Sequence, residues 1–220
     1  MRISRVHHPV TALGAGVRVG LWTQGCAIAC RGCVSRDTWD PAGGVDIPVD
    51  RLLDRLGHVP GRVDGLTITG GEPSDQPTEL TRLLIGARDV AGDRGEVWDI
   101  LLYSGREGRA LRRQLPHIES LVDALVEGPY RAELGGDDAL RGSSNQRLVL
   151  TTPLAHERYR DVASWPRRLD VAVTDDTLYL VGIPRPRDLD RLNDALAGSV
   201  RFGTTSWQPT KEDDDHAAMS

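Results

Sequence analysis

Three cysteines, all that the chain contains, lie within eight residues of one another. Cys26, Cys30 and Cys33 have the spacing C-x3-C-x2-C inside the stretch LWTQGCAIACRGCVSRDTW, residues 21–39. A structural zinc ion usually takes four ligands, but a fourth cysteine is absent and the nearest downstream histidine, His58, follows a predicted helix. Iron–sulfur clusters are also usually held by four cysteines, so a four-iron cluster on three would leave one iron open to a small molecule. The spacing alone is compatible with such a cluster, with a zinc loop and with three buried thiols.

A second motif narrows the interpretation of the cysteine spacing. The segment TGGEP, residues 69–73, follows a predicted short buried strand, whereas the cysteines follow the first predicted strand, residues 17–23. A strand-to-helix turn with two glycines is common by itself. In this order, however, the two motifs resemble the radical S-adenosylmethionine superfamily, whose fold is a (β/α)6 barrel in more or less complete form.

The resemblance implies a cofactor, a cosubstrate and their ligands. Cys26, Cys30 and Cys33 would hold a [4Fe-4S] cluster, and S-adenosyl-L-methionine would chelate the open iron and be cleaved to a 5′-deoxyadenosyl radical. The methionine moiety would lie against the TGGEP residues, which are Thr69, Gly70, Gly71, Glu72 and Pro73. Glycines let a ligand approach the backbone closely, and a carboxylate accepts from an ammonium group. The chain departs from many members in having Gly32, not an aromatic residue, before the third cysteine.

Further blocks resemble one branch, the activating proteins of anaerobic (class III) ribonucleotide reductase. In chain order they are HHPV at 7–10, the stretch 14–39, EVWDILLYSG at 96–105, and EGPYRAELGGDDALRGSSNQR at 127–147. Arg-Gly-Ser-Ser-Asn-Gln in the last block is the most specific piece. The branch implies that the adenosyl radical takes hydrogen from a glycine of the reductase large subunit and leaves a glycyl radical enzyme. It also implies a flavodoxin- or ferredoxin-type electron donor.

Motif position suggests roles for four more residues. Ser104, at the end of its strand, would hydrogen-bond the ribose, although a capping serine is an equal alternative. Arg141, Ser143 and Asn145 carry donors for the cosubstrate or the partner, and a polar turn that closes the last core strand is the alternative. Trp22 and Trp39 flank the cysteine loop and are expected to pack around it.

Alternating strands and helices must position these motifs. Apolar spacing predicts helices over 49–57 and 77–91, and β-rich runs predict strands over 66–69 and 96–105. The remaining predictions are a helix over 106–115 and strands within 122–130 and 146–152. This alternation predicts an α/β fold with a parallel sheet, and the resemblance specifies an incomplete (β/α)6 radical-SAM-type barrel.

The chain divides at Pro153 in our interpretation. Residues 1–152 form the radical SAM core, residues 153–207 a small appended ββα region, and residues 208–220 a disordered acidic tail. The appended region contains a predicted hairpin around Asp175 and Asp176, followed by a helix.

Composition excludes several classes of protein. The 220 residues carry a net charge of −5, which is not that of a nucleic-acid binder, and no apolar run approaches the ~20 residues of a membrane span. No signal peptide is recognisable, so we expect a cytoplasmic protein. Two other functions stay open: a radical enzyme that modifies a peptide or small-molecule biosynthetic precursor, and a non-enzymatic zinc or iron–sulfur scaffold.

Overall fold

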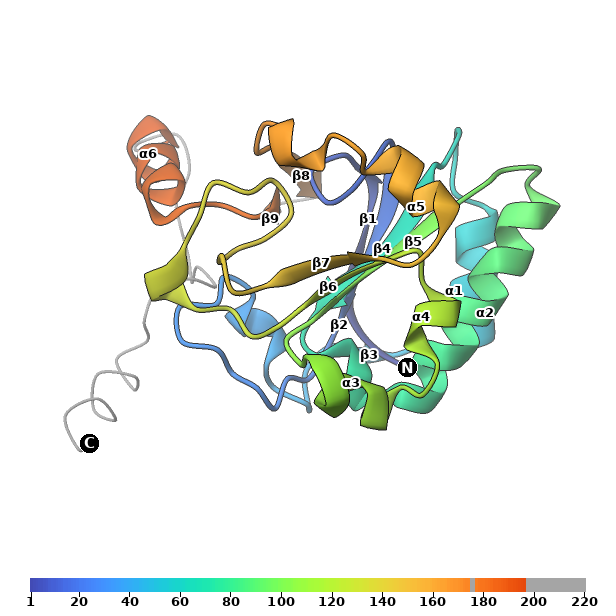
Figure 1. Cartoon of the computed structure of the whole chain (residues 1–220). Coiled ribbons are helices and arrows are strands. Elements are labelled where there is room, and N and C mark those ends of the chain that lie inside the picture. The colour runs from blue at the N-terminus through green and yellow to red at the C-terminus, as the bar shows by residue number, and fades with distance from the viewer. Residues whose placement is uncertain (175–176, 197–220) are drawn as a thin grey trace.

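The computed structural model describes residues 1–174 and 177–196 (Figure 1). The strands are β1 (Arg2–Val10), β2 (Arg18–Thr23), β3 (Val45–Asp46), β4 (Gly65–Gly70), β5 (Asp99–Ser104), β6 (Ala124–Glu127), β7 (Arg147–Leu150), β8 (Leu169–Thr174) and β9 (Thr177–Gly182). The α-helices are α1 (Val49–Gly57), α2 (Pro77–Asp93), α3 (Gly108–Gln114), α4 (Ile118–Leu121), α5 (Pro153–Arg158) and α6 (Pro186–Leu196). The predicted acidic tail, residues 208–220, lies outside the described residues, as does the stretch 197–207.

A seven-stranded mixed sheet forms the centre of the molecule. Its order is β3-β1-β2-β4-β5-β6-β7, and the four strands β2, β4, β5 and β6 run parallel. The predicted α/β class and parallel centre are confirmed. The flanking strands differ from the prediction, because β1 and β7 each pair antiparallel with their neighbours. Parallel neighbours need a crossover, usually a helix. The link between β6 and β7 contains no α-helix, so the chain turns back beside β6.

The two faces of the sheet have different partners. Side chains alternate along a strand, and Ile68 and Leu102 point into the core formed with α1, α2 and α4. Figure 1 shows these helices gathered on one side of the sheet. Thr69 and Tyr103, the next residues on β4 and β5, belong to the opposite face, where Val181 of β9 packs beside Tyr103. The hairpin β8–β9, predicted from sequence, therefore lies over the face that carries the strand-end motif.

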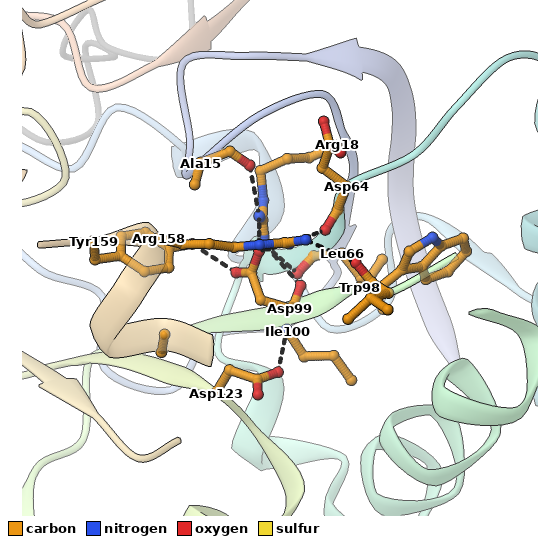
Figure 2. Close-up of polar contacts among 12 residues, drawn as sticks. Ala15, Arg18, Asp64, Leu66, Trp98, Asp99, Ile100, Asp123, Arg158 and Tyr159 are labelled. Atoms are coloured by element: carbon orange, nitrogen blue, oxygen red, sulfur yellow. Dashed lines mark hydrogen bonds and ion pairs between the residues drawn. The ribbon is translucent and has the colours of Figure 1, made fainter. Parts of the chain in front are cut away.

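A buried ion-pair network connects the first residues of strands β2 and β5 to the region after Pro153 (Figure 2). Arg18 Nη1 donates to Asp99 Oδ1 at 2.8 Å, and both side chains are fully buried. Arg158 Nη1 donates to the same oxygen at 2.6 Å, and the Tyr159 hydroxyl donates to Oδ2 at 2.7 Å. Burial by itself would raise the pKa of Asp99, but the Arg18 charge and these hydrogen bonds outweigh it and lower that pKa.

Two residues that follow the predicted domain boundary, Arg158 and Tyr159, thus pack against strands that precede it. The division of the chain at residue 152 stays a prediction. Among the described residues, no helix has the length and apolar character that crossing a bilayer requires.

Candidate functional site

The three cysteines lie on one loop that follows β2 and is closed at its base. Gly25 N donates to Thr38 O at 2.8 Å, and Cys26 N donates to Trp39 O at 3.0 Å. A turn inside the loop brings Cys33 N to 3.1 Å from Cys30 O. All three thiols are free and partly buried. The backbone therefore presents three sulfur atoms, none of them in a disulfide, from one short, closed loop.

The chemistry of this donor set, three cysteines on one loop, is compatible with an iron–sulfur cluster. Within residues 1–174 and 177–196, no three His, Cys, Asp or Glu side chains gather tightly enough to hold one metal ion. Zinc needs its ligands at ~2.3 Å from a common centre, whereas the thiolates of a four-iron cluster each bind a different iron and stand farther apart. Burial raises the pKa of the Cys30 and Cys33 thiols in the ligand-free chain, and metal binding would deprotonate them.

The TGGEP segment supports the base of the cysteine loop. Gly71 N donates to Thr23 O at 2.9 Å, and Glu72 N donates to Gly25 O at 2.8 Å. A Cβ on Gly70, whose φ is +102°, would lie 2.5 Å from Thr23 N, and one on Gly71 would lie 2.2 Å from Gly25 O. The family resemblance implies that these glycines allow close approach of a ligand. In the structure, close approach of the end of β2 already requires Gly70, and close approach of the cysteine-loop backbone already requires Gly71.

Replacing Gly71 with alanine should therefore displace the base of the loop. We expect Gly71→Ala to lower the iron retained after anaerobic reconstitution by at least about tenfold, as losses in the support of a metal ligand typically do. Iron and sulfide analysis measures this. Gly92→Ala is the matched control, since no atom lies within 4 Å of its added Cβ and the helix should be unchanged or slightly more stable. Equal iron content in both variants would contradict the role of Gly71.

Glu72 and Ser104, two of the predicted cosubstrate residues, are brought together. The carboxylate is 1% exposed, and its Oε1 accepts from the Ser104 hydroxyl at 2.8 Å and from the Ser74 hydroxyl at 2.6 Å. Gly105 N donates to Oε2 at 2.8 Å. Arg106 completes this cluster by donating to Ser74 Oγ at 2.8 Å. These polar atoms satisfy one another, and the predicted contacts to an ammonium group and a ribose stay predictions.

The RGSSNQ segment forms a turn before β7, and its polar groups bond to neighbouring residues of the same chain. Arg141 pairs with Asp138 at 2.7 Å, and the Ser143 hydroxyl accepts from a backbone amide of segment 129–131. The Asn145 amide donates to a backbone carbonyl of the same segment at 2.8 Å. These contacts are those of the polar turn that the sequence left open as the alternative. Asn145 Oδ1 is buried without a hydrogen-bond partner among the described residues.

A cavity of about 140 Å³ joins three of the predicted motifs. Its lining includes Cys33 of the loop, Thr69 at the end of β4, and Gln146 of the RGSSNQ turn. The other predicted residues lie outside its lining, in the part of the chain that the structure describes: Cys26, Cys30, Gly70, Gly71, Glu72, Pro73, Ser104, Arg141, Ser143 and Asn145. The structure thus gathers one cysteine, one strand end and one turn around a common space.

Aromatic side chains that received no binding role from the sequence complete this cavity. Trp22, expected to pack around the loop, is 5% exposed and forms part of the lining with Tyr103 and Tyr130. Ile183, just after β9, closes another wall. Alternation along β5 could have placed Tyr103 on the face of Thr69, but no local pattern places Ile183 there.

Much of this chain is similar in sequence to known proteins. The family described as a 4Fe-4S single cluster domain matches residues 12–149. The anaerobic ribonucleoside-triphosphate reductase-activating protein of Enterobacteria phage T4 is 29% identical over 155 residues, 69% of this chain and 96% of that protein. The protein of that name from Pasteurella multocida (strain Pm70) is 31% identical over 150 residues, 63% of this chain and 90% of that protein. The pyruvate formate-lyase-activating enzyme of Clostridium pasteurianum is 36% identical over 75 residues, 32% of each chain.

Proposed function

This chain belongs to the 4Fe-4S single cluster family and to the activating proteins of anaerobic ribonucleoside-triphosphate reductase, and on that premise we propose that it generates a glycyl radical on a partner enzyme. It is an enzyme of the glycyl-radical-activating type in the radical S-adenosylmethionine superfamily. Cys26, Cys30 and Cys33 would hold a [4Fe-4S] cluster, which would supply the electron for cleavage of S-adenosyl-L-methionine to methionine and a 5′-deoxyadenosyl radical. That radical then takes a hydrogen atom from one glycine α-carbon, most simply in the large subunit of anaerobic ribonucleoside-triphosphate reductase.

One observation carries the proposal: a loop with three cysteines outside any disulfide has its base hydrogen-bonded to the GGE segment at the end of β4. Cys26, Cys30 and Cys33 would hold three irons, and the hydrogen bonds from Gly71 N and Glu72 N fix the end of β4 beside them. The end of β4 is therefore where the methionine moiety would bind. Thr69, at the end of β4, and Cys33, in the loop, line one cavity beside that point.

The partners follow from the same proposal. The chain has no cysteine outside the loop, so no second cysteine-ligated cluster relays electrons, and a flavodoxin- or ferredoxin-type protein in the cytoplasm would reduce the cluster directly. We also propose that the parallel centre of the sheet belongs to an incomplete (β/α)6 barrel of the superfamily, open at one side to admit a partner loop.

Anaerobic reconstitution tests the proposal. The protein with a full complement of iron and sulfide is mixed with S-adenosylmethionine, a reductant and the candidate reductase. We expect release of 5′-deoxyadenosine and a glycyl electron-spin signal that is absent when the radical glycine of the reductase is replaced by alanine. No 5′-deoxyadenosine from protein with an intact cluster would contradict the proposal.

The other functions left open by the sequence separate in this experiment. Release of 5′-deoxyadenosine without a glycyl signal on a competent reductase would favour a peptide or small-molecule precursor as the acceptor. A non-enzymatic scaffold is the wrong interpretation, because the matched family is an iron–sulfur family and the relatives named above are activating proteins and enzymes.

A further inference from the structure

The Arg5 side chain on β1 joins the cysteine loop to the hairpin β8–β9. Its Nη1 pairs with the carboxylate of Asp37, which lies in the short 3₁₀ helix η1 (Arg36–Thr38) within the cysteine loop. The same guanidinium lies 5.9 Å from the centre of the Tyr179 ring on β9. One charged side chain therefore contacts two elements that are distant from each other along the chain.

Asp37 belongs to the arm that closes the cysteine loop. The next two residues, Thr38 and Trp39, accept the backbone hydrogen bonds that close its base, from Gly25 N at 2.8 Å and from Cys26 N at 3.0 Å. A displacement of Asp37 would therefore reach the backbone that carries the first cysteine.

Aromatic rings hold the guanidinium of Arg5. It lies 5.5 Å from the centre of the Trp22 ring as well as near Tyr179, and the Arg5 side chain is 19% exposed. A guanidinium over aromatic faces is attracted by the charge distribution of the rings. The His7 ring lies 5.4 Å from Trp22 and 4.8 Å from Tyr179. Burial and the Arg5 charge lower the pKa of His7, so at pH 7 it adds no second positive charge to the group.

These contacts join residues inside and outside the matched family region. Trp22 and Asp37 lie within residues 12–149, whereas Arg5, His7 and Tyr179 lie outside them. The cysteine loop shared with the family is thus supported in this chain by side chains that the family match does not include.

The hairpin that carries Tyr179 is itself fixed to the segment after β1. A two-stranded hairpin is at best marginally stable by itself. Here the Asp170 carboxylate on β8 accepts from Thr11 N at 2.6 Å, from the Thr11 hydroxyl at 2.7 Å and from Ala12 N at 2.9 Å. Arg167 Nη1 donates to Ile183 O at 2.7 Å, which fixes the end of β9. The Tyr179 ring is therefore presented to Arg5 by an anchored backbone.

We propose that Arg5 is a positioning residue for the cluster site: supported by Tyr179, it holds Asp37, and through this contact the hairpin determines how firmly the cysteine loop retains a cluster. The inference rests on the cluster ligands of the proposed function and goes beyond them by giving a role to residues outside the matched family region. A ligand loop that is already held in place loses less conformational freedom when it binds. Loss of the support should therefore speed cluster loss although every sulfur ligand is still present.

Iron release tests this role in the reconstituted full-length protein. Anaerobic protein with a complete cluster is mixed with the iron(II) chelator bathophenanthroline, and the rate of iron release is followed by absorbance. Arg5→Met removes the charge but keeps an unbranched side chain, and Tyr179→Leu removes the ring. Each should raise the rate at least about fivefold, the size of effect expected for one partly buried contact between a cation and a ring. Arg82→Met is the matched control, because Arg82 also pairs with an aspartate, Asp50, but on helices α1 and α2.

The double variant shows whether the two residues act in one line. If Tyr179 acts through Arg5, the protein with both Arg5→Met and Tyr179→Leu should release iron no faster than Arg5→Met alone. Independent contributions would multiply instead, and that result would overturn the proposed coupling.

Hydrogen exchange of the cluster-free protein separates positioning from a general loss of stability. Peptides that contain Gly25 and Cys26 should exchange faster in Arg5→Met and in Tyr179→Leu than in the natural chain, because their amides close the loop base. Peptides of α1 and α2 should keep their natural rates. Faster exchange in both regions alike would overturn the positioning role.

The outcomes distinguish this inference from the proposed function. If the natural chain retains no iron after reconstitution, the cluster assignment of the proposed function fails. If the natural chain holds the cluster and both single variants release iron at the natural rate, the role of Arg5 alone is overturned. Iron release requires neither S-adenosylmethionine nor a partner enzyme, so a failure of radical chemistry leaves this test unaffected.

Discussion

Replacing Cys30 with alanine is expected to abolish cluster-dependent chemistry while the chain stays folded. The variant loses one of the three sulfur ligands, and no other cysteine exists in the sequence to replace it. Changes in the support of a metal ligand already cost ~10–100-fold in affinity or activity, so loss of the ligand itself should lower 5′-deoxyadenosine release by at least about 100-fold. Iron analysis and product release, measured on the same anaerobic sample, report the effect.

Ala27→Ser provides the control for this loss. Ala27 is exposed on the same loop, and its replacement disturbs neither a sulfur atom nor the backbone hydrogen bond from Ala27 N to Asp75. Iron content and product release should equal those of the natural chain. A Cys30→Ala protein that retained full iron and cleaved S-adenosylmethionine at the natural rate would disprove the assignment of this thiol.

Asp99→Ala should produce the largest loss of stability. The carboxylate is fully buried and pairs with Arg18, which is itself 0% exposed, and with Arg158 (Figure 2). Removing one partner of a buried ion pair leaves an uncompensated charge and costs ~3–5 kcal/mol. We expect the free energy of unfolding to fall by about that amount in urea denaturation at neutral pH.

An exposed pair in the same molecule calibrates this expectation. Asp50 pairs with Arg82 at 3.0 Å, and both side chains are more than half exposed. Exposed pairs contribute ~0–1 kcal/mol, so Asp50→Ala should change the free energy of unfolding by less than about 1 kcal/mol. Equal, small losses in both variants would show that the Asp99 network does not stabilise the fold as its burial indicates.

Sequence patterns predicted the elements that can be recognised from their own residues, and missed features that depend on pairing with distant strands. The helix over 49–57 is confirmed as α1 because its apolar residues recur at helical spacing and bury one face. Strand β1 was missed because RISRVHHPV has no clean alternation, and it forms by pairing with β2 and β3. The antiparallel direction of β7 was also missed, since strand direction depends on how a distant connection returns to the sheet.

The same division applies to the site. Cysteine spacing and the GGEP motif carry the family resemblance from which the chemistry was predicted, and ligands on one short loop are neighbours in any fold that forms the loop. By contrast, the close approach of Gly71 to the loop base joins segments about 45 residues apart along the chain. Only the fold reveals that these glycines serve the loop backbone as well as the expected ligand.

Sequence motifs thus predict the chemistry of this protein, whereas they do not predict the shape of the cavity beside the cysteine loop. Thiol number, thiol spacing and the glycine pair are local properties, and they carry the family resemblance that predicted an iron–sulfur enzyme. The cavity arises where Cys33, Tyr103 and Ile183 meet, on elements separated by many tens of residues. Their meeting depends on which faces of the sheet and hairpin are buried together, and tertiary packing alone decides that.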